Sequence, residues 1–176
     1  QPGQGRAQDQ HASTPRARCA VVMTFGVQRA ILAAMTITAK RYDQIRVGDK
    51  ARTTKTISER DVTEFARITG DVNPVHVDDA FARQSPFGKR IAHGFLSGSL
   101  FSTVLGTLLP GPGTIYLRQE MEFLKPVFIG DTVTAECEVI GKKDAKKIIT
   151  FRTTLRNQQE ETVLAGQAVV LKHERS

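Results

Sequence analysis

Hydrophobic and polar residues alternate with period two along much of the C-terminal half of the chain. Four such runs are separated by turn-forming residues at 129–131, 141–146 and 157–160. The positions that share a face are Ile115, Leu117, Met121 and Phe123; Val133, Ala135, Cys137 and Val139; Ile149, Phe151, Thr153 and Leu155; and Val163, Ala165, Gln167, Val169 and Leu171. Period-two alternation is typical of half-buried strands, so we predict four antiparallel strands.

Before these runs the spacing becomes helical. The longest predicted helix runs from Gly94 to Leu109 and ends at the Pro/Gly-rich segment 110–113. Its apolar stripe consists of Leu96, Leu100, Phe101, Val104, Leu105 and Leu108. The helix also contains Gly98 and Gly106. A glycine in a helix costs roughly 1 kcal/mol relative to alanine, so we expect a sheet or a ligand to approach closely there.

A shorter helix is predicted upstream. Ser58 and Asp61 have the spacing of a capping box, and Gly70 fits the helix end. Thr-rich residues 48–57 before it are typical of a strand, and Asp78 could cap another short helix. One early strand, one apolar helix and four long strands together predict an α+β domain whose antiparallel sheet curls around a central helix.

Composition narrows the function classes. The chain has 176 residues, 40% hydrophobic and 24% charged, which fits one well-cored globular domain. No apolar run reaches the roughly 18 residues of a membrane span. Of the net charge of +7, +4 lies in residues 1–40, and there is no Trp for base stacking. We therefore expect neither a nucleic-acid nor a membrane partner.

The first forty residues differ from the rest. Residues 1–18 are rich in Gln, Arg and Pro and are interpreted as disordered, whereas residues 20–39 are apolar, with Arg and almost no acids. An upstream extension or tag is favoured over a transit peptide. We predict a domain at 41–176 and a cytoplasmic location, with a mitochondrial one as the alternative. Cys19 and Cys137 are too few for a disulfide framework or a metal cluster.

The segment from Gly70 to Asp78 carries candidate chemistry. It places Asp71 and His76 five positions apart with Pro74 between them, a spacing that does not share a helix face. Pro74 pushes the preceding residue out of the helical region, so the segment is predicted to be a turn. Two interpretations stay open here: an acid/base pair that holds and activates a water molecule, or an Asx turn that only satisfies nearby backbone.

Two motifs in sequence resemble the MaoC-like dehydratases, and among them the single-domain (R)-specific enoyl-CoA hydratases. They are Phe65-x4-Gly70-Asp71-x-Asn73-Pro74-x-His76-x-Asp78 and Ile91-Ala92-His93-Gly94-Phe95-Leu96. The resemblance implies a hot-dog fold, a homodimer with active sites near the subunit interface, and reversible hydration of trans-2-enoyl-CoA to (R)-3-hydroxyacyl-CoA. Coenzyme A would be part of the substrate, with no cofactor and no metal.

The same resemblance implies the site residues. The catalytic residues would be Asp71, His76 and Ser102, and the substrate-binding residues would be Asn73, His93, Gly94, Phe95, Leu105 and Val170. Gly94 would offer its amide to the thioester oxygen, and Leu105 and Val170 would line the acyl pocket. From the residues alone, Gly94 could be a plain helix start, His93 a capping or packing histidine, and Ser102 a serine bonded to the preceding turn.

Two other functions compete with the hydratase. A hot-dog acyl-CoA thioesterase would release free thiol, although that family normally places its acid on the central helix. A non-catalytic acyl-thioester-binding subunit would bind substrate and change nothing. Shared architecture does not decide among the three.

Overall fold

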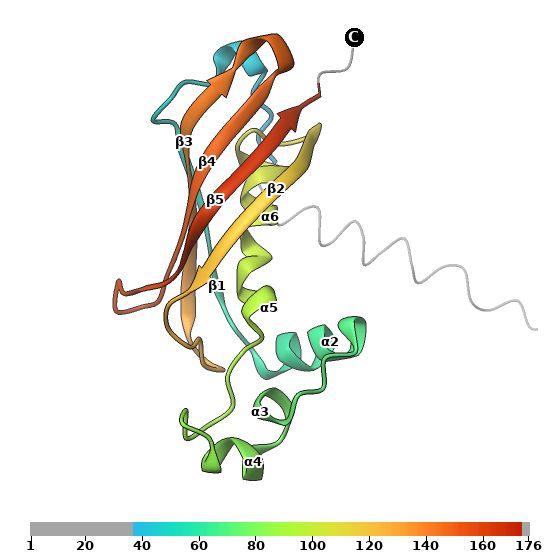
Figure 1. Cartoon of the computed structure of the whole chain (residues 1–176), viewed down its shortest axis with the longest axis vertical. Coiled ribbons are helices and arrows are strands. Elements are labelled where there is room, and N and C mark those ends of the chain that lie inside the picture. Colours follow the sequence, from blue (N-terminus) through green and yellow to red (C-terminus); the bar gives the residue numbers. More distant parts are fainter. Residues whose placement is uncertain (1–36, 174–176) are drawn as a thin grey trace, which may run out of the picture. The chain divides into compact units, whose positions relative to one another are not determined.

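Five antiparallel strands form one sheet. The computed structural model describes residues 37–173, within a compact unit that spans Thr36–Ser176. The sheet order is β1-β3-β4-β5-β2. The bounds are β1 Lys50–Thr56, β2 Thr114–Phe123, β3 Thr132–Lys143, β4 Ile148–Arg156 and β5 Thr162–Lys172. The sheet curves along the central helical segments (Figure 1), which confirms the predicted α+β hot-dog arrangement.

The predicted helix from Gly94 to Leu109 is present as three consecutive segments. These are α5 (Gly94–Gly98), α6 (Leu100–Thr103) and a π-helical segment, η2 (Val104–Leu108). The backbone at Ser99 stays right-handed helical, with φ −61° and ψ −21°. The interruptions are therefore changes of hydrogen-bond spacing: Ser102 N–H donates three residues back, and Leu109 N–H donates five residues back to Val104.

The helix packs its apolar stripe against the concave side of the sheet. Phe101, Val104 and Leu105 are fully buried together with the inward positions of β3, β4 and β5. Burying one such side chain contributes about 1.5–3 kcal/mol. Cys137 is one of the buried β3 positions, as its place in the alternating run predicted. Cys19 lies outside the described residues.

Strand β2 departs from simple alternation. It is an edge strand, and a bulge shifts its register with β5 between Tyr116 and Arg118. As a result Ile115, Leu117 and Phe123 are 47%, 52% and 50% exposed. The period-two pattern predicted the strand, but only part of its apolar face is covered within one chain.

Three short helices lie at the end of the sheet where the central helix begins (Figure 1). They are α2 (Glu59–Thr69), α3 (Pro74–Val77) and α4 (Asp79–Gln84). The predicted caps are confirmed: Ser58 Oγ accepts from Asp61 N–H at 3.2 Å, and Gly70 ends α2 with φ +78°. The segment after Asn73 is a helical turn, since proline is tolerated at the first helical position.

The start of the domain lies slightly before the predicted residue 41. Residues 37–40 already contact the domain, because Thr38 N–H donates to Thr107 O at 2.8 Å and Lys40 N–H to Pro110 O at 3.2 Å. The rest of the predicted leader, and with it the question of location, lies outside the described residues. The turn between β3 and β4 carries η3 (Asp144–Lys146), which η1 (Tyr42–Gln44) contacts through a hydrogen bond from Tyr42 Oη to Asp144 Oδ1. Lys142 Nζ donates to the backbone carbonyls of Tyr42 and Ile45. Within residues 37–173 no helix is long and apolar enough to cross a membrane.

Candidate active site

The turn after α2 fixes one carboxylate oxygen of Asp71 and leaves the other available. Asp71 Oδ1 accepts from Asn73 N–H at 3.2 Å, and Asn73 Oδ1 accepts from Val75 N–H at 3.3 Å. The Asx-turn interpretation is therefore correct for the local geometry. No described residue donates to Asp71 Oδ2, and the side chain is exposed. The turn therefore fixes the position of the Asp71 carboxylate through Oδ1 and leaves Oδ2 able to accept another hydrogen bond.

His76 is held by its own backbone partner. It lies in α3, is 8% exposed, and its Nδ1 lies 2.8 Å from the carbonyl oxygen of Ile91. A carbonyl only accepts, so Nδ1 donates this hydrogen bond, and Nε2 is the ring nitrogen left to interact with a water molecule. Side-chain ligand atoms of Asp71, His76 and His93 all lie within 4.8 Å of one another. The two residues predicted to share a water are therefore brought together.

His93 contacts both Asp71 and His76. Its side chain is 2% exposed, and its ring centroid lies 3.9 Å from that of His76 and 5.0 Å from that of Phe65. Its Nε2 donates to the backbone carbonyl of Asp71 at 3.0 Å. It precedes α5 but makes no side-chain capping bond, so the packing interpretation is confirmed and the capping one is wrong. Its predicted contact with substrate stays a prediction.

The same three side chains could by distance hold a metal ion. A metal bound by imidazole lies along the nitrogen lone pair, in the plane of the ring. The rings of His76 and His93 are close and only 32° from parallel, so their lone pairs do not converge as two ligands of one ion would. The arrangement fits a stacked histidine pair that orients one water or proton better than it fits a metal centre.

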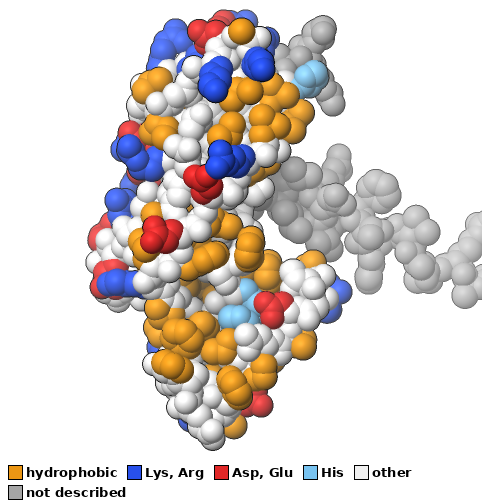
Figure 2. Space-filling view, viewed as in Figure 1, with side chains coloured by type: hydrophobic (Ala, Val, Ile, Leu, Met, Phe, Trp, Pro, Cys, Tyr) orange, Lys and Arg blue, Asp and Glu red, His pale blue; other side chains and the backbone are white. Residues whose placement is uncertain are grey.

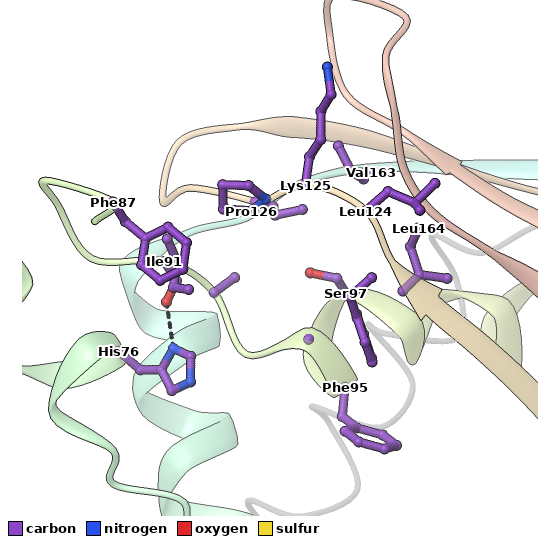
Figure 3. Close-up of a pocket in the computed structure, with 14 residues that line it drawn as sticks. His76, Phe87, Ile91, Phe95, Ser97, Leu124, Lys125, Pro126, Val163 and Leu164 are labelled. Carbon is purple, nitrogen blue, oxygen red and sulfur yellow. Dashed lines mark hydrogen bonds between the residues drawn. The ribbon is translucent and has the colours of Figure 1, made fainter. Parts of the chain in front are cut away.

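A cavity of about 440 Å³ opens beside His76 (Figure 3). Three of the predicted site residues line this cavity: His76, Gly94 and Phe95. The rest of its wall is mainly apolar and consists of Phe87, Ile91, Ala92, Phe123, Leu124, Pro126, Val127, Val163 and Leu164. On this side of the molecule, histidine atoms lie next to an acidic side chain, with apolar side chains around them (Figure 2). An acid/base pair therefore lies next to an apolar space of the size that small-molecule sites have.

Gly94 lies against the ring of Phe123. A Cβ at position 94 would lie 2.6 Å from Cε1 of Phe123, so this half-exposed ring would have to move. Gly94 is the first residue of α5, where backbone N–H groups have no partner within the helix. Its amide is thus placed at the cavity wall, and its predicted role toward a thioester oxygen stays a prediction.

Three predicted residues lie elsewhere. Ser102 is exposed and lines a second hollow of about 340 Å³, to which Phe95 also contributes. Its hydroxyl makes no hydrogen bond to Asp71 or to the preceding turn among residues 37–173, so the back-bonding alternative is not seen. Leu105 and Val170 are 0% exposed in the core and line neither cavity. Their acyl-pocket role, and the catalytic role of Ser102, stay predictions.

Sequence reasoning missed the opposite wall of the cavity. Ser97 and Lys125 both line it, together with the first residues of β5. Ser97 is one of several small residues in the helix, and no spacing rule distinguishes which of them faces a cavity. Lys125 Nζ lies 2.6 Å from Glu161 Oε1, and this hydrogen bond, followed by one from Asn157, holds the pKa of Glu161 below its usual range.

Several proteins similar to this chain are described as hydratases. The chain is 47% identical over 130 residues to an (R)-specific enoyl-CoA hydratase of Rhodospirillum rubrum, covering 74% of this chain and 90% of the relative. It is 45% identical over 126 residues to an (R)-specific enoyl-CoA hydratase of Aeromonas caviae, covering 72% and 94%. The solved R-hydratase PhaJ1 of Pseudomonas aeruginosa superposes with a TM-score of 0.73 at 45% identity, covering 76% and 86%.

The family assignment rests on the same region. The sequence model of the family described as MaoC like domain matches residues 41–161. These residues include the Asp71 turn, the start of the central helix and three of the four long strands. The chain therefore belongs to the MaoC-like dehydratase family.

Proposed function

We propose that this protein is an (R)-specific enoyl-CoA hydratase that adds water reversibly to trans-2-enoyl-CoA. The observation that carries the proposal is the convergence of Asp71 and His76 beside an apolar cavity whose wall includes Gly94. The hydratases that are 45–47% identical over most of the chain support it. The cavity would hold an acyl thioester, and the polar pair would hold the water.

The chemistry follows from the polarity of the substrate. Conjugation with the thioester carbonyl makes C3 of the enoyl group electrophilic, so a water oxygen forms a bond there while electron density moves to the carbonyl oxygen. The amide of Gly94 would stabilise that charge; loss of such a donor typically costs roughly 10²–10³ in turnover. The proton from water passes to the Asp71–His76 pair, and C2 takes a proton from the same pair. The pair therefore ends the cycle unchanged.

The protein is proposed to act as a homodimer. Strand β2 leaves one sheet edge unpaired within the described chain, and three of its apolar side chains, Ile115, Leu117 and Phe123, are about half exposed. Exposed edges of this kind are usually covered by another strand or element. A second copy would also cover the hollow that contains Ser102, which includes Tyr116 and Met121 from the same strand.

Purified protein with crotonyl-CoA tests the activity. The hydratase predicts loss of the conjugated enoyl absorbance, no free thiol, and a product of R configuration. Thiol release would instead identify a thioesterase, and binding with neither change would identify a non-catalytic subunit. Either result would overturn the proposal.

A further inference from the structure

One polar atom in the cavity wall has no partner and no role in the reaction described above. Ser97 lies in α5 and is 2% exposed, and its Oγ forms no hydrogen bond within the described part of the chain. Ser97 nevertheless lines the cavity, and in Figure 3 its hydroxyl points into that space. A buried hydroxyl without a partner is unfavourable, so its retention in this orientation calls for a ligand.

Several other helical hydroxyls of this chain, though not that of the exposed Ser102, bond back to the preceding turn. Thr63, Thr69 and Thr107 each donate to the carbonyl four residues earlier, at 3.0, 2.7 and 2.6 Å. This back-bonding is the ordinary behaviour of a mid-helix hydroxyl. Ser97 does not follow it, although the carbonyl of His93 lies one turn before it. Its side chain faces the cavity instead.

The cavity itself cannot supply the partner. The nearby wall consists of apolar side chains, among them Leu124, Val127 and Leu164. A ligand atom that can accept or donate one hydrogen bond must therefore enter an otherwise apolar space. An amide group within an aliphatic chain has both properties: it forms a hydrogen bond, and the chain on either side of it is apolar.

We propose that Ser97 binds the first amide of the carrier arm of the thioester substrate, the amide that coenzyme A and acyl-carrier thioesters share. This inference rests on the proposed hydratase function. Ser97 follows Gly94 by three residues and hence by about one helical turn, or roughly 5 Å along the axis. Four bonds separate the thioester carbon from that amide nitrogen, also roughly 5 Å in an extended chain. With the carbonyl at Gly94, the amide reaches Ser97.

The charge at the mouth of the cavity agrees with a carrier arm that runs outward from Gly94 past Ser97. Lys125 belongs to the lining, and its side chain extends from the wall away from the cavity (Figure 3). The arm of both carriers ends in phosphate, which could share the amino group of Lys125 with Glu161, its present partner at 2.6 Å. The reacting end would lie at His76 and the anionic end outside.

The test compares thioesters with and without the amide. Ser97→Ala should weaken binding of butyryl-CoA and butyryl-N-acetylcysteamine about 3- to 10-fold, the value of one neutral hydrogen bond. It should leave binding of S-butyl thiobutyrate, which lacks the amide, unchanged. Dissociation constants from competition against a bound acyl-CoA give this comparison without turnover. For crotonyl-CoA the KM should rise by the same factor with kcat unchanged, as expected for a contact made equally throughout the reaction.

Controls separate this role from a structural one. Thr107→Val removes a back-bonded hydroxyl of the same helix and should change none of the three affinities, while Ser97→Cys keeps the size if alanine fails to fold. Equal weakening of all three thioesters, or no weakening of any, would overturn the inference. A wild-type protein that binds thioesters but hydrates none would overturn the proposed function, and the affinity comparison would still decide on Ser97.

Discussion

Replacing Asp71 by asparagine isolates the charge of the catalytic carboxylate from its structural role. The Oδ1 atom accepts from Asn73 N–H at 3.2 Å, and an asparagine side-chain oxygen can accept the same bond. His93 binds the backbone carbonyl of residue 71, which the substitution does not alter. The side chain is exposed, so we expect the free energy of unfolding to change by no more than about 0.5 kcal/mol.

The effect on rate should be much larger. An asparagine cannot accept a proton from water at neutral pH, and a positioned acid/base group typically contributes about 10²–10⁴ in rate. At roughly 1.36 kcal/mol for each tenfold change, the barrier should rise by about 2.7–5.4 kcal/mol. Stability and rate are therefore predicted to separate clearly.

The assay follows the loss of crotonyl-CoA absorbance alongside denaturant unfolding of the same preparation. Asp79→Asn is the matched control, since Asp79 is an exposed carboxylate of the neighbouring helix whose partner is Arg90. That variant should keep near-normal turnover because Asp79 lines neither cavity and lies outside the Asp71–His76 pair. A folded Asp71→Asn protein with near-wild-type turnover would refute the assignment of this carboxylate.

Three further predictions concern stability and reactivity. Gly166→Ala would place a Cβ 1.9 Å from a backbone carbonyl oxygen of β2, so it should lower the free energy of unfolding by about 1–3 kcal/mol in denaturant melts. Gly141→Ala is the control and should change the free energy of unfolding little, because the nearest atom to its Cβ would lie 3.9 Å away. Equal unfolding midpoints for the two variants would contradict this prediction. Burial of Asp61 opposes its ionisation, but hydrogen bonds with Ser58 and an ion pair with a β1 lysine outweigh it, so the pKa of Asp61 lies below its usual range. The stabilisation from this carboxylate should be complete above the ordinary carboxyl pKa of 3.8 and be lost as pH falls through the lower folded value; unfolding of Asp61→Asn against wild type over pH 2–7 checks it, and a difference that does not shrink in acid would disprove it. Burial, with a smaller contribution from a neighbouring carboxylate, raises the pKa of Cys137 to about 12, so in a protein whose other cysteine is serine a thiol reagent at pH 8 should react only after unfolding; rapid reaction of the native protein would show that the core opens.

The fold was readable because its signals are local. The capping box at Ser58, the glycine end of α2 and the proline stop of the central helix each depend on neighbouring residues only. The alternating runs reported which residues of β3 and β4 point inward. In β5 the prediction was wrong beyond Val163: Leu164, Ala168 and Val170 are buried, whereas the predicted Ala165, Gln167, Val169 and Leu171 are only partly buried. The changes of helical spacing after Ser99 and the bulge in β2 left no such signal, because they depend on how the helix and sheet fit each other.

The candidate site divides in the same way. The turn with Asp71 and His76 and the glycine that opens the central helix could be identified from two short motifs. The stacking of His93 on His76 could not, since these residues lie seventeen positions apart and meet only when α3 packs beside the start of α5. The free hydroxyl of Ser97 was equally hidden, because a helix wheel does not show which small residue faces an unfilled space.

The sequence by itself determined the elements, their order and the residues able to do acid/base chemistry, since periodicity, caps and turns act over a few residues. Only the tertiary structure decided which of those residues meet, which are buried in the core, as Leu105 and Val170 are, and where a cavity remains. Contacts between distant segments and the voids between them depend on packing in three dimensions, which local pattern does not encode.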